Sequence, residues 1–394
     1  MKNRPQLILH PGKEKSVGRH HPWIFSGAVG KVDGSPAEGD LVDVLSSDGK
    51  WLCVGHFQKQ SIMVKVLSFD TPNIDTQFWF ERFGMAIRYR EQLGFFSRMD
   101  ETNVFRLAHA EGDMLPGLVA DYYDGVVVLQ AHSKGMHRMF PTFVSILTEL
   151  LGDRLVSVFD KSSATLPSGK STDGYIYGKE FDEYEVKENN CRYLVNFFEG
   201  QKTGFFVDQR DNRALLASIS AGKRVANCFG YTGGFSVSAL RGGASYVETI
   251  DLSPKAIELC ERNVELNSFD ASMHRGVIAD ALNYIYTMGD DFDIVVLDPP
   301  AFAKSHYYLE QALKGYRLIN KKAIEKIRPG GIILTFSCSQ AVSNEDFQTM
   351  VFSASNLANR KVRIIRRLSH SSDHPVSIFH PEGEYLKGLM LYVE

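Results

Sequence analysis

The feature that most constrains this chain is a regular alternation of apolar strands and helical segments in its C-terminal half. From about Arg213 onward, nearly continuous apolar segments are separated by stretches with a helical period. These segments read RVANCF, YVETID, MHRGV, FDIVVLD and GIILTFS. Strands that are apolar on both faces are typical of a parallel sheet covered by helices on both sides. The alternation therefore predicts a doubly wound α/β domain.

The rest of the chain requires further domains. Its 394 residues exceed the roughly 250 to 300 at which a single hydrophobic core stops growing. Short extended segments with Asp-Gly turns predict a small β-barrel at the N-terminus, and a helical period from Asp75 followed by strands predicts a small α+β domain. We expect three domains, at residues 1–72, 73–185 and 186–394. The stretch 162–178, rich in Gly, Ser and Thr, is expected to be a surface loop.

The charge of the chain limits how it could bind a nucleic acid. A formal net charge of -3 argues against a uniformly basic protein, so any nucleic-acid contact must be local. Six Lys or Arg residues up to Lys31 face the single acid Glu14, and Arg360 to Arg367 carries five with no acid. Each patch is either a contact for phosphates or a solvated face.

Neither a membrane partner nor a metal is expected. No run approaches about 18 consecutive apolar residues, and the N-terminal apolar run is too short for a signal peptide, so we expect a cytoplasmic protein. The cysteines are odd in number and far apart, with no CxxC pair that would indicate a zinc site or a disulfide framework. They are Cys53, Cys191, Cys228, Cys260 and Cys338. Any special cysteine must therefore act alone.

Two motifs in the C-terminal half indicate a nucleotide-like ligand. Gly230, Gly233 and Gly234 follow the first apolar strand, where glycines let the backbone approach a ligand. Asp251 ends the next strand about 20 residues downstream, where an acid can accept both hydrogen bonds from a ribose diol. The glycine spacing is not the GxGxxG of dinucleotide folds, and either motif alone would be weak.

The third motif, LDPPAF, is the most discriminating. Asp298 ends a buried strand and is followed by Pro299 and Pro300, which remove amide donors and leave carbonyl acceptors. Such a turn suits a flat ring that bears an amino group, with Phe302 available to stack on it. The bland alternative is an ordinary strand stop.

The fourth motif is FSCS, in which Cys338 stands just beyond the last predicted strand. In a doubly wound sheet this strand end and that of Asp298 should lie side by side, so that both residues face one pocket. A buried structural cysteine is the usual alternative, but the position at a strand end favours a reactive thiol.

At these residues the chain resembles the class I S-adenosylmethionine (SAM)-dependent methyltransferases, and among them the RlmI-type 23S rRNA (cytosine-5)-methyltransferases. The resemblance is carried by NCFGYTGGFSVSAL, QKTGFFVDQRDNR, LDPPAF and FSCS, and HPWIFSGAV is similar to the start of a PUA domain. It implies an α/β fold with an N-terminal PUA RNA-binding β-barrel, a small central α+β domain and a C-terminal Rossmann-like methyltransferase domain.

The resemblance also implies roles for individual residues. SAM would lie on the loop after the first strand, with Asp251 on its ribose, Asp280 near its adenine and a segment from Lys202 closing over its methionine end. The cofactor site would comprise Phe229, Gly230, Tyr231, Thr232, Gly233, Gly234, Asp251, Leu252, Ser253, Asp280, Ala281, Asp298, Lys202, Thr203, Phe206, Asp208 and Arg210. Cys338 would be the nucleophile and Asp298 its catalytic partner. The second cysteine of another subgroup is absent, because Pro300 and Ala301 stand there.

These roles predict methylation of a cytosine of 23S rRNA at C5 through a Cys338–C6 intermediate. RNA would be bound by Lys13, Lys15, Arg19, Pro299, Pro300 and Phe302. The alternatives are an N-methyltransferase acting on guanine or adenine, which needs no cysteine, an NAD-dependent dehydrogenase, and a non-catalytic RNA-binding factor. The oligomeric state stays open, with a homodimer as one candidate.

Overall fold

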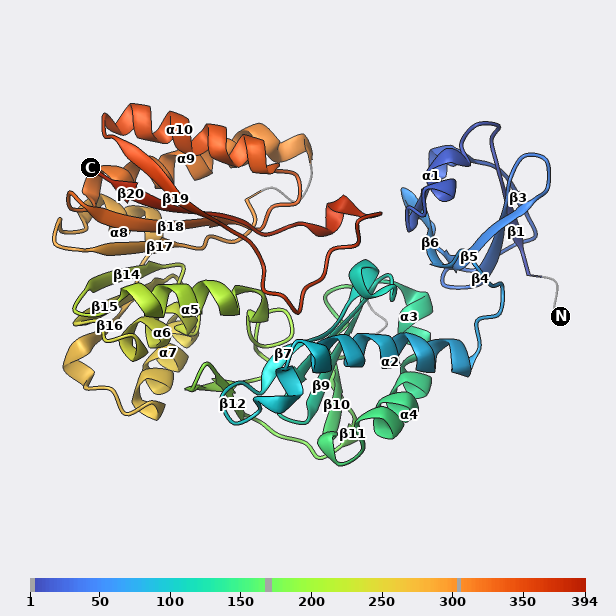
Figure 1. Ribbon diagram of the computed structural model, residues 1–394, viewed down its shortest axis with the longest axis horizontal. Helices are drawn as coiled ribbons and strands as arrows, with labels where there is room; N and C mark the ends of the chain where they lie inside the picture. The colour runs from blue at the N-terminus through green and yellow to red at the C-terminus, as the bar shows by residue number, and fades with distance from the viewer. Residues whose placement is uncertain (1–3, 167–171, 303–305) are drawn as a thin grey trace. The chain divides into compact units, whose positions relative to one another are not determined.

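The computed structural model of the protein describes residues 4–166, 172–302 and 306–394 (Figure 1). The chain divides into two compact units. The first unit comprises Met1–Tyr184, Val195–Val207 and Ser372–Gly383. The second comprises Glu185–Leu194, Asp208–Ser371 and Glu384–Glu394. The chain therefore crosses between the units repeatedly, and the expected domain boundaries after residues 72 and 185 stay predictions.

The N-terminal part of the first unit is a six-stranded sheet in the order β2-β6-β5-β4-β1-β3. Its elements are β1 (Gln6–Leu9), α1 (Lys15–Gly18), β2 (Trp23–Phe25), β3 (Val29–Asp33), β4 (Leu41–Leu45), β5 (Trp51–Phe57) and β6 (Ile62–Ser68). Alternate residues of β4, Val42 and Val44, are fully buried and pack in one core with Leu7 and Val64. The extended segments expected from this alternation are confirmed.

The middle of the first unit is a five-stranded sheet, in the order β11-β10-β9-β8-β7, packed against helices. Its elements are α2 (Thr76–Gln92), β7 (Val104–His109), β8 (Leu118–Tyr123), β9 (Val126–Ala131), α3 (Lys134–Arg138), α4 (Phe140–Leu151), β10 (Ser157–Asp160) and β11 (Gly174–Gly178). The side chain of Asp75 caps α2 by accepting from the amide of Phe78 at 2.9 Å. Trp79 of α2 packs on Phe143 of α4, with ring centroids 5.2 Å apart.

The expectation of a loop over residues 162–178 is wrong at its C-terminal end. Gly174–Gly178 forms β11, which pairs antiparallel with β10. Residues 167–171 of that stretch lie outside the described residues. The strand forms because the edge of β10 supplies backbone partners and Phe159 packs edge-on against Tyr175, with ring centroids 4.9 Å apart. Neither influence can be seen in local composition.

A small hairpin and a seven-stranded sheet account for the strands that follow. The hairpin joins β12 (Tyr184–Glu188) to β13 (Cys191–Val195), and the sheet has the order β16-β15-β14-β17-β18-β20-β19. Its strands are β14 (Arg224–Cys228), β15 (Tyr246–Asp251), β16 (His274–Ile278), β17 (Ile294–Leu297), β18 (Gly331–Ser337), β19 (Val362–Leu368) and β20 (Lys387–Val393). The strand order reverses between β14 and β17, which confirms the predicted doubly wound sheet.

Helices cover both faces of this sheet. They are α5 (Arg210–Ile219), α6 (Gly234–Arg241), α7 (Pro254–Leu266), α8 (Ala281–Thr287), α9 (Leu309–Lys326) and α10 (Asn344–Ala358). Helices α8 to α10 share one apolar core with Ala226, Cys228 and Leu297 of the central strands. Helices α6 and α7 pack on the opposite face, over β14 to β16. The side chain of Ser253 caps α7, and Pro254 is its first residue, as predicted.

The last two strands were not expected. The basic run from Arg360 forms the edge strand β19, which pairs antiparallel with β20, and β20 pairs antiparallel with β18. These strands place Lys387, the first residue of β20, opposite Ser337, the last residue of β18. The C-terminal strand is therefore a structural neighbour of the turn that carries Cys338.

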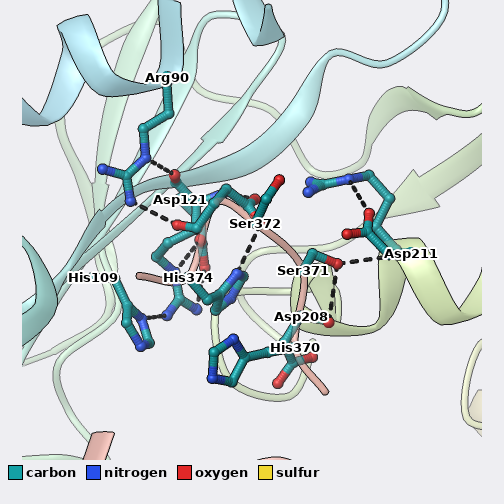
Figure 2. Close-up of polar contacts among 12 residues, drawn as sticks. Arg90, His109, Asp121, Asp208, Asp211, His370, Ser371, Ser372 and His374 are labelled. Atoms are coloured by element: carbon teal, nitrogen blue, oxygen red, sulfur yellow. Dashed lines mark hydrogen bonds and ion pairs between the residues drawn. The ribbon is translucent and has the colours of Figure 1, made fainter. Parts of the chain in front are cut away.

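The segment Ser372–Gly383, between β19 and β20, belongs to the first unit and joins its buried charged cluster. Arg90 donates to both carboxylate oxygens of Asp113, at 2.6 and 2.8 Å, and to the carbonyl of Asp373 at 2.6 Å. Arg106 pairs with Asp121 at 2.6 Å and contacts Nδ1 of His109 at 2.8 Å. Figure 2 shows Asp121 and His109 beside Arg90 and His374. Every charged group of this cluster has a partner of opposite charge or a hydrogen bond.

Candidate functional site

The loop after β14, residues 229–234, is the most strained part of the candidate site. Phe229 and Tyr231 have φ of 60° and 46°, and Gly233 has φ of 82°. A Cβ on Gly230 would lie 2.3 Å from Cγ2 of Thr249, and one on Gly233 would lie 2.4 Å from Sγ of Cys260. Both glycines are therefore required for the loop to rest against β15 and α7. Residues other than glycine in the left-handed region cost conformational free energy, and they cluster at ligand sites.

Asp251 lies beside this loop, as the sequence predicts. It ends β15, and its Oδ2 accepts from the amide of Tyr231 at 2.9 Å while its Oδ1 accepts from the amide of Ser253 at 2.9 Å. Each carboxylate oxygen keeps a lone pair for a further donor, such as a ribose hydroxyl. Leu252 beside it is 69% exposed, and provides an apolar surface next to the carboxylate.

Asp280 follows β16 at the same edge of the sheet. Its side chain caps α8 by accepting from the amide of Asn283 at 2.9 Å, and the carboxylate is exposed. The next residue, Ala281, is buried in the core. Because β14, β15 and β16 are parallel neighbours, the loop, Asp251 and Asp280 end on one edge. A cradle of tight loop and acids on adjacent strand ends fits an adenosine-bearing cofactor.

A buried polar network supports the loop, and the sequence did not predict it. Ser236 of α6 accepts from the side chain of Asn227 at 2.8 Å and contacts Oγ1 of Thr249 at 2.5 Å. Thr249 in turn contacts Nε2 of His274 at 2.7 Å. Burial lowers the pKa of His274 to about 4, so the ring is neutral at physiological pH.

Asn263 fixes the loop directly. It is fully buried on α7, its amide donates to the carbonyl of Thr232 at 2.9 Å, and its oxygen accepts from the amide of Leu194 at 2.8 Å. A sequence signal existed, because Asn263 occupies an apolar position on the buried face of α7, between Cys260 and Val264. A polar residue at such a position must find partners, and here they are the backbone of the loop and of β13.

The carboxyl ends of β17 and β18 bring the other two motifs together. The strands pair in parallel, with Leu297 opposite Thr335, so Asp298 and Cys338 follow neighbouring strands as predicted. The Sγ atom of Cys338 lies 4.0 Å from the carbonyl oxygen of Pro299. The thiol is therefore next to the turn that would hold a base.

Cys338 differs from the other four cysteines, all of which the structure describes. Those four are buried, whereas Cys338 is partly exposed. Burial raises the pKa of Cys53, Cys191 and Cys228, and raises the pKa of Cys260 to about 12, which keeps these thiols protonated and inert. Only Cys338 combines access with a position at the strand ends.

Phe302 forms an aromatic surface on the same turn. Its side chain is 37% exposed, and its ring lies against Tyr316 of α9 with centroids 4.6 Å apart. The Tyr316 hydroxyl contacts Oγ of Ser339 at 2.9 Å, so α9 ties the turn after β17 to the turn after β18. Pro299 is buried and Pro300 is exposed.

The segment from Lys202 to Arg210 is divided between the units. Thr203 is buried and donates to Oδ2 of Asp121 at 2.6 Å, and the ammonium of Lys202 lies 4.6 Å from the ring centroid of Phe206, all within the first unit. Asp208 and Arg210 belong to the second unit and are also buried. That this segment closes over the methionine end of SAM stays a prediction.

Asp208 is anchored to the strand ends. Its carboxylate accepts from the Tyr385 hydroxyl at 2.7 Å. Its carbonyl accepts from the hydroxyl of Ser371 at 3.1 Å (Figure 2). Ser371 Oγ also accepts from the amide of Asp211 at 3.1 Å. The start of α5 is thereby fixed to Ser371, which follows β19, and through Asp208 to Tyr385, which precedes β20.

The basic residues Lys13, Lys15 and Arg19 surround α1 in the first unit. All three are exposed, and none forms an ion pair with a described residue. The described residues contain no cluster of His, Cys, Asp and Glu that could hold a metal ion. None of the helices that the structure describes is long and apolar enough to cross a membrane.

Comparisons with known proteins identify the family. Residues 163–376 match the model of the S-adenosylmethionine-dependent methyltransferase family, and residues 7–69 match a PUA-like domain. The chain is 40% identical to ribosomal RNA large subunit methyltransferase I of Aeromonas hydrophila, over 98% of each chain. It is 39% identical to the protein of that name from Vibrio parahaemolyticus, over 97% of this chain and 98% of the other.

A solved structure shares the fold. It is a protein of Streptococcus mutans described as a SAM-dependent methyltransferase, with a TM-score of 0.84 and 22% identity, covering 98% of this chain and 99% of the other. The resemblance, the N-terminal PUA-like domain and the cofactor SAM are thus confirmed, and the dehydrogenase alternative is wrong. The chain belongs to the S-adenosylmethionine-dependent methyltransferase family, within the RlmI group of ribosomal RNA large subunit methyltransferases.

Proposed function

We propose that this protein transfers the methyl group of SAM to C5 of a cytosine in 23S rRNA through a covalent bond between Cys338 and C6. The observation that carries the proposal is that Cys338 alone among the five cysteines is not buried, and stands beside the Asp-Pro-Pro turn. The relatives named large subunit rRNA methyltransferase I support the class of substrate. Such a substrate would be met in the cytoplasm.

Carbon 5 of cytosine is too weak a nucleophile to be methylated without activation. SAM supplies an electrophilic methyl group. The Cys338 thiolate forms a bond to C6. The electron pair of the C5–C6 double bond moves onto C5 and is delocalised toward N3, which makes C5 nucleophilic. Asp298, protonated or hydrogen-bonded at N3 and N4, stabilises that charge. C5 then forms its bond to the methyl carbon while the methyl–sulfur bond of SAM breaks.

Release of the product reverses the first step. A base removes the proton from C5, the electron pair restores the C5–C6 double bond, and the C6–S bond breaks to return the Cys338 thiolate. Pro300 and Ala301 stand where another subgroup has a second cysteine, so in this chain release proceeds without one.

The target base must leave its stack to reach the strand ends. Unstacking costs about a few kcal/mol, and favours single-stranded or looped RNA. The exposed ring of Phe302 is available to stack on the extruded base. Lys13, Lys15 and Arg19 would hold phosphates elsewhere on the RNA, contributing affinity that falls with salt.

The test is transfer of radiolabelled methyl from SAM to unmodified 23S rRNA, followed by digestion to nucleosides. We expect label in 5-methylcytidine, and a loss on the order of 10³-fold or more for Cys338→Ala. Cys53→Ala, at a buried thiol in the core of the N-terminal sheet, is the matched control and should retain activity once its stability is allowed for.

The same experiment separates the alternatives. Label in a methylated guanosine or adenosine that survives in Cys338→Ala would identify an N-methyltransferase instead. Absence of transfer, together with undetectable SAM binding by calorimetry, would leave only an RNA-binding factor.

A further inference from the structure

Lys387 is a buried cation next to the proposed nucleophile. It is the first residue of β20, pairs with Ser337, and its side chain is almost fully buried. Its ammonium donates to the carbonyl of Ser339 at 2.8 Å and to the carbonyl of Tyr385 at 2.7 Å. One of its partners is thus the residue that follows Cys338 directly.

This ammonium has no carboxylate partner among the described residues. No described carboxylate lies within ion-pairing distance, and Glu384 instead accepts from the side chain of Asn344 at 3.1 Å. Burial lowers the pKa of Lys387, while negative charge on Cys338 and then on Glu384 raises it. A buried cation without a counter-ion is costly, and a thiolate beside it would offset that cost.

Three acidic groups of the described residues stand near Cys338 in the chain or through their contacts. Tyr316 of α9 contacts Ser339, Asp298 precedes the Pro299 carbonyl that lies near Sγ, and Glu384 precedes β20. Burial raises the pKa of Tyr316, so its hydroxyl is neutral. Each of these acids, if charged, would oppose a thiolate. The ammonium of Lys387, by contrast, favours a thiolate.

We propose, resting on the proposed role of Cys338 as nucleophile, that Lys387 is a positioning residue that stabilises the Cys338 thiolate and holds the turn through the carbonyl of Ser339. A nearby cation increases the fraction of thiolate at neutral pH. The thiolate is the form that adds to C6. Lys387 acts through Cys338 and needs no contact with the RNA.

The test measures the rate at which iodoacetamide alkylates Cys338 as a function of pH, with mass spectrometry to identify the residue. The other cysteines are buried and serve as internal references. Lys387→Gln removes the charge but keeps two N–H donors for the carbonyls, and Lys387→Arg keeps the charge. We expect the Gln variant to react about 10-fold more slowly at pH 7, with its midpoint moved to higher pH, and the Arg variant to retain most of the wild-type rate.

A matched control is Lys161→Gln in the first unit. Lys161 is also a buried lysine that donates to a main-chain carbonyl, that of Phe198 at 2.6 Å, and this change should leave the alkylation profile unaltered. A profile of Lys387→Gln that coincides with the wild type would overturn the proposal. If Lys387→Gln unfolds below the assay temperature, Lys387→Met, which also lacks the positive charge, takes its place in the comparison with the wild type.

Alkylation requires neither RNA nor SAM, so its outcome is independent of the proposed methylation. If Cys338→Ala retains methyl transfer, the proposed function fails while the alkylation profile still decides the role of Lys387 on the thiol. If both hold, Lys387→Gln should lower kcat at pH 7 with KM for SAM unchanged, and kcat should recover as the pH rises. A loss that is the same at every pH would indicate a merely structural lysine.

Discussion

Two buried cations of this protein differ in how their charge is balanced. Arg90 in the first unit is fully buried, and both of its terminal nitrogens donate to the carboxylate of Asp113. Lys387 in the second unit is almost as deeply buried, yet its hydrogen bonds go to two neutral carbonyls. The first arrangement is complete within the folded protein. The second would gain from a negative charge, and Cys338, the residue before Ser339, can supply one as a thiolate.

The contrast distinguishes a buried cation that has a carboxylate partner from one that has only carbonyl partners. A bidentate pair such as Arg90 with Asp113 fixes geometry and leaves nothing for a ligand. The same cluster holds Asp373, whose Oδ2 accepts from the amide of Arg106 at 2.7 Å and whose Oδ1 contacts His374 at 2.9 Å. These contacts keep the segment Ser372–Gly383 within the first unit (Figure 2).

Breaking the balanced pair should have the largest effect on stability. Arg90→Met leaves the buried carboxylate of Asp113 without its cation, so we expect a loss of about 3–5 kcal/mol in the free energy of unfolding, measured by urea denaturation. The control is Arg98→Met, because Arg98 and Glu101 form an exposed pair that contributes less than about 1 kcal/mol. Equal losses in both variants would contradict the comparison.

Removing an uncharged buried side chain should have an intermediate effect on the free energy of unfolding. Asn263→Ala leaves the carbonyl of Thr232 and the amide of Leu194 without partners, so we expect a loss of about 1–3 kcal/mol and weaker SAM binding by calorimetry. Glu258→Ala, at an exposed position on the same helix, should change neither quantity. Unaltered SAM binding by a folded Asn263→Ala protein would mean that the loop does not depend on this bond.

Of these buried groups, the unbalanced cation should cost the least to remove, and its effect should depend on pH. In a Cys338→Ala background, Lys387→Met should change stability by less than about 1 kcal/mol at pH 7, since losing the bonds to the carbonyls is offset by no longer burying a charge. The pKa of Lys387 is lowered by burial, so the folded state releases the proton before the unfolded state does. As the pH rises toward 10.5, the protein with Lys387 should therefore gain stability relative to Lys387→Met. A flat difference between pH 7 and 10.5 would contradict this.

Replacing exposed cations should have the smallest effect on stability. Replacing Lys13, Lys15 and Arg19 by Gln should change stability by less than about 0.5 kcal/mol per residue, because all three are exposed. If they contact phosphates, RNA binding should weaken and the slope of log affinity against log salt should fall by about 1 per residue. Filter binding between 50 and 200 mM salt, roughly the range over which such contacts are lost, gives that slope. An unchanged slope would assign RNA binding to another surface.

Local pattern was enough to find the sheet and the motifs at its edge. The strand segments ending near Asp251, Asp298 and Cys338 are apolar runs long enough to be buried, and side chains at their carboxyl ends must share one edge of a parallel sheet. Ser253 and Pro254 predicted the start of α7 correctly, because helix capping is a local interaction. These features depend on neighbours within a few residues.

The sequence by itself thus determined the doubly wound sheet, the neighbouring strand ends that carry Asp298 and Cys338, and the motifs at that edge. Only the tertiary structure decided that Gly174–Gly178 is a strand, that the basic run after Arg360 is a sheet edge, that Asn263 donates to the loop, and that Lys387 donates to the carbonyl of Ser339. The reason is physical, because each of these outcomes depends on a partner far away in the chain. Ser339 and Lys387 are separated by 48 positions in the sequence. No local pattern predicts the hydrogen bond between the ammonium of Lys387 and the carbonyl of Ser339.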